Sequence, residues 1–413
     1  MWHTCSLTIV TLLGLLVIVQ PQELAKPCDV THCDLPDCRC SNTIPPLEEK
    51  KIPQIVHLTF NEAVTSTSER FFEQLFTGEY KNPNGCNIRG THYVSHEYSD
   101  YSLVHTYWSR GHEIGSISIS HENNVTYWQL INETGWALEM DGMRDILSGM
   151  ANVPIDEIQG IRSPDLQNGG NAQFKMMKDY GFLYDSSLPT EEFAFVNMDR
   201  ALWPYTFDYL SIQDCQIEPC LNQSFPGIWE YPILMLEDSR DTFGNGQGEP
   251  CSFFGACQGY PDPDPKHIFV MLKKNFDRVY NGNRAPFGLH AQTAFFVEPQ
   301  TWMFDGYVMF VQYLAALEDV YIVPVIDGLK FVQNPVALEE AATYEPFGCD
   351  NFPKPFDCLA KSCRYAEDSL PPTMQGSGEK YMTTCHECPK KYPWLGNPQG
   401  LEDEEYMNPN DLY

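Results

Sequence analysis

Positive charge is scarce in this chain. Among its 413 residues, 26 are Lys or Arg and 56 are Asp or Glu, which gives a formal net charge of −30. Such a surface repels a polyanion, so the charge balance excludes DNA or RNA binding as a function class. An uncharged polysaccharide remains a compatible partner.

Long apolar runs are also scarce. One apolar stretch extends from about Leu7 to Val19, which is too short to cross a bilayer. Its length is typical of a secretory signal, so we expect a signal peptide over residues 1–25, with an uncertain cleavage site. The mature protein is then expected to be secreted into an extracellular matrix, without membrane association. A retained signal anchor is the alternative.

Cysteine, in contrast, is abundant. Of 15 cysteines, Cys5 lies in the expected signal, which leaves 15 − 1 = 14. In an oxidising compartment this even number predicts up to seven disulfides. Most of these cysteines are clustered, whereas Cys86 stands alone and needs a distant partner. The run Cys385-His386-Glu387-Cys388 also permits a zinc site, but secretion favours disulfides. Acceptor triplets for N-glycosylation begin at Asn124, Asn132 and Asn222.

Strand and helix patterns alternate along the chain. We expect strands at 54–60, 90–96, 113–119, 158–162, just before Tyr184, and at 227–235, 286–296 and 320–325. We expect helices at 66–76, 101–110, 136–150, 173–180, 268–280 and 308–317. This alternation predicts parallel βα units, and hence one α/β barrel.

The composition divides the chain into segments. A Cys-rich extension is expected at 26–50 and the barrel at 51–345. A Cys-rich segment that packs on the barrel follows at 346–400, and an acidic, disordered tail at 401–413. The hydrophobic content of 43% is that of a globular protein with a large core.

Four of the expected strands end in polar or chemically informative residues. The first strand ends at Asn61-Glu62, the third is followed by His121, the next delivers Arg162 to Asp165, and a late strand delivers His290 to Gln292. In parallel α/β barrels the carboxyl ends of the strands build the active site. We therefore expect these segments to meet on one rim.

Several short motifs are spread from about Cys28 to Trp394. They are Gly85-Cys86, Thr91-His92-Tyr93-Val94-Ser95-His96, Arg110-Gly111-His112-Glu113-Ile114, Gly169-Gly170-Asn171, Leu202-Trp203-Pro204-Tyr205-Thr206, Trp229-Glu230 and Tyr392-Pro393-Trp394-Leu395. Together they resemble the polysaccharide deacetylases of carbohydrate esterase family 4, which share the NodB-type domain, and most closely the insect chitin deacetylases. The resemblance implies a distorted parallel (β/α) barrel with disulfide-rich loop insertions.

The resemblance also implies zinc-dependent removal of acetyl groups from N-acetylglucosamine units. The family pattern has Asp-Asp at 61–62, as base and metal ligand, and His-x-x-x-His at 117 and 121 as the other ligands. It places a histidine, the general acid, at 292. Here the base position holds Asn61, the ligand positions hold Glu62 and Ile117, and the acid position holds Gln292.

Other family positions are kept. His121, Arg162 and Pro164 are retained, whereas Asp165 replaces an aromatic residue. We expect Pro164 and Asp165 to line a substrate groove together with Trp203, Tyr205 and Trp229. Burial in the core is the alternative for the two tryptophans.

These substitutions predict a catalytically inactive homologue. Loss of one general acid or base costs about 10²–10⁴-fold in rate, and catalytic zinc usually has three protein ligands. We therefore expect no fully occupied zinc site. The expected role is to bind or organise chitin or chitin oligosaccharides in a matrix such as a gut lining or cuticle, in contact with other matrix proteins.

Two alternatives remain open at the level of sequence. The first is an active, metal-dependent chitin deacetylase with a rearranged site, in which zinc binds and residues such as His290 or Asp165 take over lost roles. His57, His92 and His96 are further candidates for such a rescue, although burial in the core is the commoner place for each. The second alternative is a protein–protein interaction module that has kept the fold and lost its affinity for chitin.

Overall fold

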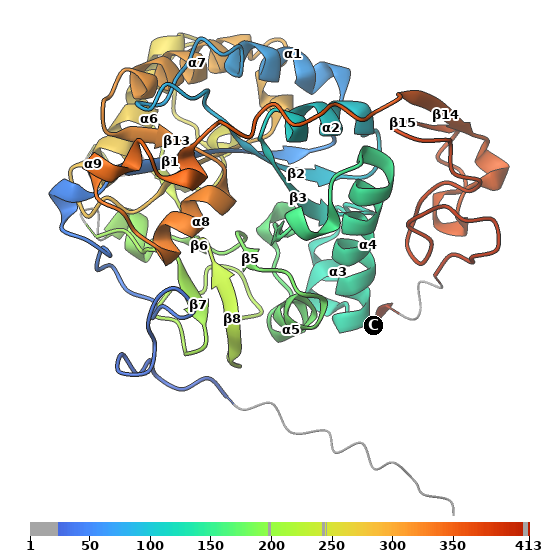
Figure 1. Cartoon of the computed structure of the whole chain (residues 1–413), viewed down its shortest axis with the longest axis horizontal. Coiled ribbons are helices and arrows are strands. Elements are labelled where there is room, and N and C mark those ends of the chain that lie inside the picture. The colour runs from blue at the N-terminus through green and yellow to red at the C-terminus, as the bar shows by residue number, and fades with distance from the viewer. Residues whose placement is uncertain (1–23, 197–199, 242–243, 245, 408–411) are drawn as a thin grey trace, which may run out of the picture.

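The computed structural model describes residues 24–196, 200–241, 244, 246–407 and 412–413, in which strands and helices alternate (Figure 1). The strands are β1 (Gln54–Glu62), β2 (Thr91–Ser95), β3 (Glu113–Ser118), β4 (Gly160–Ile161), β5 (Tyr184–Asp185), β6 (Pro189–Thr190), β7 (Tyr205–Phe207), β8 (Phe225–Glu230), β9 (Ile233–Leu234), β10 (Leu236–Glu237), β11 (Pro250–Cys251), β12 (Phe287–Ala291), β13 (Val320–Ile322), β14 (Lys361–Tyr365) and β15 (Lys380–Thr384). The α-helices are α1 (Ser66–Leu75), α2 (Tyr101–Ser109), α3 (Val125–Leu130), α4 (Glu133–Ala151), α5 (Asn171–Tyr180), α6 (Pro265–Tyr280), α7 (Thr301–Ala315), α8 (Val325–Gln333) and α9 (Leu338–Ala341).

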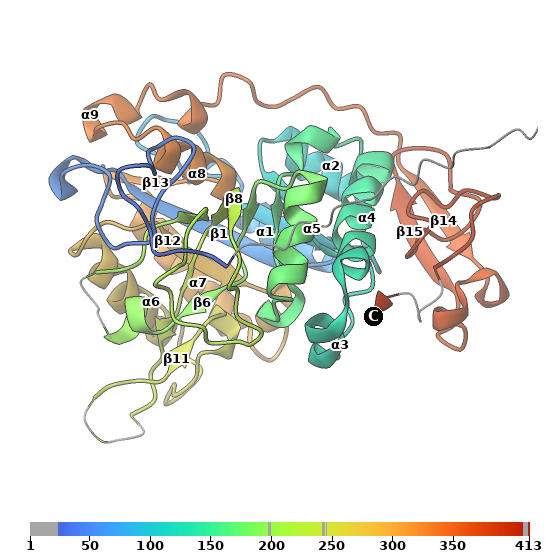
Figure 2. The same cartoon turned by 90° about the horizontal axis from the view of Figure 1, so that it is seen from below.

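A nine-stranded sheet forms the centre of the protein. Its order is β12-β1-β2-β3-β4-β5-β8-β7, and β13 also pairs with β1. All of these pairs are parallel except β7–β8. Eight of the nine residues of β1 are buried, as expected for a strand that is covered on both faces. Helices α6 and α7 pack together on one part of the sheet, and α2, α4 and α5 lie on another (Figures 1 and 2). The predicted α/β architecture is confirmed.

Side chains from strands that are not neighbours in the sheet meet across its interior. Arg162, which follows β4, donates from Nη1 to Thr59 Oγ1 of β1 at 2.7 Å. The hydroxyls of Tyr93 on β2 and Tyr184 on β5 lie 3.0 Å apart. The sheet therefore curls round a polar interior. Strand pairing among the described residues does not close it, in keeping with the distorted barrel that was predicted.

Three expected strands end earlier than their sequence pattern predicts. The strand expected at 286–296 ends at Ala291, and a 3-10 turn, Thr293–Phe296, follows it. Thr293 turns away from the sheet because its backbone N–H binds a side chain on β1. The strand expected at 320–325 ends before Pro324, which has no N–H for a ladder, and α8 begins there. The strand expected at 227–235 is divided into β8 and β9.

Seven disulfides join the fourteen cysteines, as the sequence predicts. The pairs are Cys28–Cys40, Cys33–Cys38, Cys86–Cys349, Cys215–Cys220, Cys251–Cys257, Cys358–Cys385 and Cys363–Cys388. The isolated Cys86 has its distant partner, 263 residues away in the sequence. Since Cys385 and Cys388 are both in disulfides, the zinc alternative for that run is wrong.

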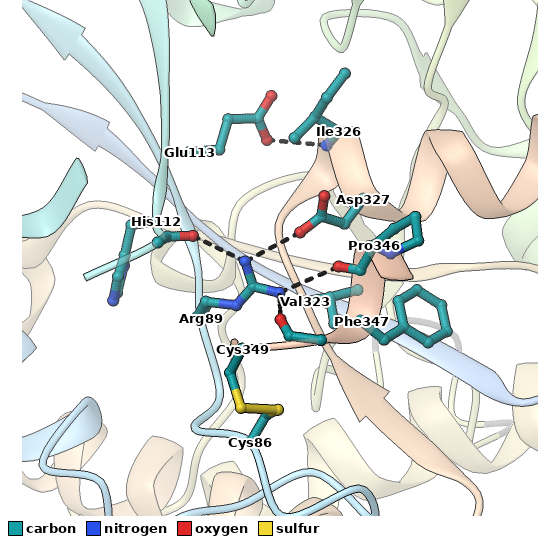
Figure 3. Close-up of polar contacts among 12 residues, drawn as sticks. Cys86, Arg89, His112, Glu113, Val323, Ile326, Asp327, Pro346, Phe347 and Cys349 are labelled. Atoms are coloured by element: carbon teal, nitrogen blue, oxygen red, sulfur yellow. Dashed lines mark hydrogen bonds and ion pairs between the residues drawn. A yellow bond between two sulfur atoms is a disulfide. The ribbon is translucent and has the colours of Figure 1, made fainter. Parts of the chain in front are cut away.

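A buried arginine anchors the segment that follows α9. The Arg89 guanidinium, which is 4% exposed, forms an ion pair with Asp327 at 3.2 Å. It also donates to the carbonyl oxygens of Gly111, Pro346 and Gly348 at 3.1–3.3 Å (Figure 3). The Cys86–Cys349 disulfide lies beside it. These contacts fix the start of the Cys-rich C-terminal segment near the beginning of β2.

The rest of this segment carries the β14–β15 hairpin beyond α4 (Figures 1 and 2). Described residues of the acidic segment expected at 401–413 make backbone contacts with the rest of the chain. Met407 N–H donates to the Leu395 carbonyl at 3.0 Å, and Asn132 N–H donates to the carbonyl of the buried Leu412 at 2.9 Å.

The predicted signal peptide, 1–25, lies outside the described residues, except for its last two. Among the described helices, none combines the length and apolarity needed to cross a membrane.

Arg89→Met tests the C-terminal anchor. Removal of one partner from a buried ion pair leaves the other charge uncompensated, so the free energy of unfolding should fall by about 3–5 kcal/mol in urea denaturation. Arg364→Met is the matched control, because the Arg364–Glu379 pair is exposed and its loss should change little. Equal stability of the two variants would contradict this role of Arg89.

Candidate functional site

Arg162 lies at the centre of the predicted site and is fully buried. Its Nε and Nη2 donate to the backbone carbonyl and the hydroxyl of Ser186, at 2.6 and 2.8 Å. Nη1 donates to Thr59 Oγ1 at 2.7 Å and to Asn61 Oδ1 at 2.9 Å. The guanidinium also lies 4.2 Å from the ring centroid of Tyr93. All of these acceptors are neutral, and no described carboxylate forms an ion pair with Arg162.

The charge of Arg162 is balanced from a short distance by a carboxyl pair. Asp185 is buried, and its carboxylate accepts from Gln173 Nε2 at 2.9 Å and from the backbone and hydroxyl of Ser187. Burial raises the pKa of Asp185 to about 6. Burial and the neighbouring Asp185 raise the pKa of Glu230 well above its usual range. Ionisation of one carboxyl group of this pair therefore disfavours ionisation of the other.

Asn61 occupies the position of the catalytic base in the family pattern. It is 2% exposed, and its carbonyl oxygen accepts the hydrogen bond from Arg162. A carboxamide cannot take up a proton at neutral pH. The side chain is thus held in place by the arginine but cannot activate a water molecule.

Glu62 occupies the first metal-ligand position. Its Oε2 accepts from the backbone N–H of Thr293 at 2.9 Å and from the Thr293 hydroxyl at 2.5 Å. Its Oε1 is buried and has no hydrogen-bond partner among the described residues. Burial raises the pKa of Glu62 to about 8. One oxygen of this carboxyl group is therefore bound by Thr293, and the other is open to a ligand.

The other two ligand positions lie at and after the end of β3. Ile117 is 1% exposed and sits where the β2–β3 register shifts, between the partners of Val94 and Ser95. The next residue, Ser118, has a φ of 135°, and its hydroxyl accepts from the His121 N–H at 3.0 Å. Burial lowers the pKa of His121, and the nearby Asp165 offsets part of that effect. Asp165 itself is exposed.

These side chains do not fit a catalytic zinc ion. Of the three positions expected to supply ligands, Ile117 is buried and has no lone pair, and Glu62 is engaged by Thr293. His121 keeps a donor atom, and Glu62 keeps one oxygen, Oε1, without a hydrogen-bond partner among the described residues. Catalytic zinc usually needs three protein ligands. At most two of the three expected ligands therefore remain.

The histidines considered for rescue of the chemistry are held in the core, whereas Asp165 is exposed near His121. Gln292 directly follows β12 and is half-buried. His290, two residues earlier, is 4% exposed, and its Nδ1 lies 2.8 Å from Thr59 Oγ1. His57 bridges the Val323 carbonyl and the Tyr231 hydroxyl at 2.7 and 2.6 Å. His92 and His96 are also buried, with ring nitrogens near His112 and Tyr101. None of these histidines is exposed at the rim.

The predicted aromatic groove is wrong. Trp203 and Tyr205 are 0% exposed and Trp229 is 1% exposed, so none offers a ring face to a sugar. These residues fill the core around the antiparallel β7–β8 pair, where a wide apolar surface has to be covered. Of the groove residues, Pro164 is buried, which leaves Asp165 exposed at the strand ends.

The three predicted glycosylation sites lie in accessible places. Asn124 and Asn222 are exposed and Asn132 is half-buried. Asn124 and Asn132 cap the N-termini of α3 and α4 through their side-chain oxygens, which leaves each amide nitrogen outside the cap.

The candidate site also contains residues that the sequence did not predict, and Thr293, which binds Glu62, is one of them. Its position directly after Gln292 is the only signal that could have pointed to it.

The chain is 34% identical over 383 residues to chitin deacetylase 8 of Bombyx mori, covering 91% of this chain and 94% of that protein. It is 33% identical over 386 residues to chitin deacetylase 1 of the same organism, covering 91% of this chain and 69% of that protein. A solved polysaccharide deacetylase structure from Pseudomonas aeruginosa PAO1 aligns with 68% of this chain and 92% of its own, at 15% identity and a TM-score of 0.42. No family model matches the chain.

His57→Gln tests the assignment of that histidine to the core. Burial lowers the pKa of His57 from 6.5 to about 4, so the unfolded chain binds more protons between these values. The stability that this residue contributes is therefore present above pH 6.5 and is lost as the pH falls towards 4. Urea denaturation should give a pH slope that is shallower in the variant by up to about 1.4 kcal/mol per pH unit.

A variant at an exposed histidine provides the control. His386→Gln changes a residue on the surface of the C-terminal segment and should keep the wild-type slope. A His57→Gln slope identical to that of wild type would show that His57 titrates freely, as a residue at an open rim would.

Proposed function

This chain belongs to the insect chitin deacetylases of carbohydrate esterase family 4, and we propose that it binds chitin without removing the acetyl groups. The polymer would lie along the carboxyl ends of β1, β3 and β4, where Glu62, His121 and Asp165 are placed. Its role would be to hold or organise chitin in an extracellular matrix, next to other matrix proteins.

The contact between Arg162 and Asn61 is the observation that supports this proposal best. In a hydrolytic site, the group at position 61 has to accept a proton from water. Here the only acceptor atom of that side chain receives a hydrogen bond from a buried guanidinium at 2.9 Å. The substitution keeps the shape of the site and its hydrogen bond but removes the base.

The remaining changes act in the same direction. Ile117 fills a ligand position with an apolar side chain, and Gln292 cannot protonate a leaving amine. A site that loses its base, its acid and one metal ligand together retains little of the mechanism. The surrounding barrel is kept, so a surface that binds the polymer can remain after catalysis is lost.

Secretion is supported by the cysteine chemistry. Seven disulfides in one chain are typical of an oxidising, extracellular environment and rare in the cytosol. The net charge of −30 is compatible with a neutral polymer and unfavourable for a polyanion. Chitin carries no charge on its acetylated units, so the acidic protein does not repel it.

One experiment tests binding and catalysis together. The secreted protein is incubated with insoluble chitin and zinc, and both the protein in the pellet and the acetate in the supernatant are measured. Wild type should be retained on chitin and release no acetate above the protein-free control. A variant carrying Asn61→Asp, Glu62→Asp, Ile117→His and Gln292→His should be retained equally and release acetate, at least about 10²-fold faster than wild type.

The matched control omits a single ligand. The same variant without Ile117→His keeps a base and an acid but has only two ligand positions, so it should remain close to wild type. Circular dichroism of each variant shows whether it is folded. Acetate release by wild type would contradict the loss of catalysis, and failure of wild type to bind chitin at any salt concentration or pH would contradict the binding role.

A further inference from the structure

A cavity of about 670 Å³ lies between the strand ends and the C-terminal segment. Its volume is within the range of pockets that bind small molecules. The barrel contributes Glu97, Ser120, Glu122 and Tyr127 to its lining. The C-terminal part of the chain contributes residues within 371–380 and within 394–407, together with Leu412. This cavity is separate from the Asn61–Arg162 cluster, and none of its lining residues belongs to the family motifs for metal or base.

The cavity nevertheless lies at the same edge of the sheet as the degenerate site. Glu97 follows β2, and Val94 of β2 pairs with Glu62 of β1. Ser120 and Glu122 flank His121 after β3. Carboxyl ends of parallel strands share one edge of a sheet. A polymer that extends from Glu62 towards His121 would therefore continue in the direction of this cavity.

The barrel wall of the cavity is held in a fixed arrangement by one buried carboxyl group. Glu139 of α4 is 0% exposed and accepts from the backbone N–H groups of Ile119 and Ser120, at 3.1 and 2.8 Å. It also accepts from the Ser120 hydroxyl at 2.5 Å and the Tyr127 hydroxyl at 2.6 Å. The loop around His121 and the ring of Tyr127 are thus positioned before any ligand arrives.

The opposite wall is tied to the barrel. Lys380, which begins β15, forms an ion pair with Glu97, and its ammonium lies 5.4 Å from the ring centroid of Tyr98. Trp394 packs against His96, with ring centroids 6.1 Å apart. The disulfides Cys358–Cys385 and Cys363–Cys388 fix the hairpin that carries Lys380. The cavity is therefore a space between two braced surfaces.

The lining combines aromatic edges with charged groups. Tyr127, Trp394 and Tyr406 supply apolar surface, while Glu97, Glu122 and Lys380 supply hydrogen-bonding groups. A purely apolar ligand would cover these polar groups without offering them hydrogen bonds, at a cost in free energy. A sugar presents apolar C–H faces and hydroxyl groups together, which matches both parts of the lining.

We propose that this cavity binds further N-acetylglucosamine units of the chitin chain that lies across the strand ends. The proposal rests on the proposed function, because it extends the binding of the same polymer. The C-terminal segment thereby becomes part of the binding surface, and the length of the oligosaccharide determines whether the cavity is used.

Calorimetric titration with N-acetylglucosamine oligomers of different length tests this role. In wild type, the hexasaccharide should bind about tenfold more tightly than the disaccharide, which is equivalent to about 1.4 kcal/mol. Thr373→Trp places a large ring at the cavity from an exposed lining position. It should remove the preference for the hexasaccharide and leave the binding of the disaccharide unchanged.

A tryptophan elsewhere in the same loop is the control. Gln375 is exposed and does not line the cavity, so Gln375→Trp should bind both oligomers as wild type does. If Thr373→Trp keeps the wild-type preference, or if wild type has no preference, the cavity is not a sugar site although chitin binding stands. If wild type binds neither oligomer, the proposed function fails as well.

Discussion

The buried guanidinium of Arg162 is the interaction around which the centre of this protein is arranged. A charge taken out of water is costly unless its hydrogen bonds are satisfied. Arg162 meets that requirement with acceptors from β1 and from the residue after β5, and with the ring of Tyr93 on β2. Strands β1 and β5 are not neighbours in the sheet, so the arginine links distant strands across its interior. The same contact holds Asn61 in place.

The same requirement explains how catalysis can be lost while the fold is kept. An amide at position 61 still accepts a hydrogen bond from Arg162, and the carboxyl groups of Asp185 and Glu230 remain close enough to favour its charge. The interior thus remains satisfied without a carboxylate on β1. Isoleucine stands at the buried position 117, where the family pattern has a polar ligand. An apolar side chain there leaves no polar atom without a hydrogen bond, so it does not destabilise the core. On the proposed function, the substitutions remove catalysis from a scaffold whose packing does not depend on it.

The sequence predicted the elements whose pattern is strong and local. The dense apolar run at Gln54 to Phe60 and the amphipathic helix at Ser66 to Phe76 lie where they were expected. Residues whose role depends on distant partners could not be placed in this way. Trp203 and Trp229 are typical of sugar-binding grooves in composition, but only the fold shows that their rings are covered. No sequence motif marks Thr293 or Glu139, because each forms its hydrogen bonds with residues that are distant from it in the sequence. The acidic tail was expected to be disordered from its charge, yet Met407 and Leu412 make contacts that composition cannot reveal.

The central claim is that this chain has kept the barrel of a chitin deacetylase and has lost its catalytic metal. The most direct measurement is the zinc content of the purified wild-type protein, determined by mass spectrometry after dialysis against a buffer with micromolar zinc. The account predicts far less than one zinc ion per chain, with no change in Glu62→Ala. One zinc ion per chain, lost in that variant, would contradict it.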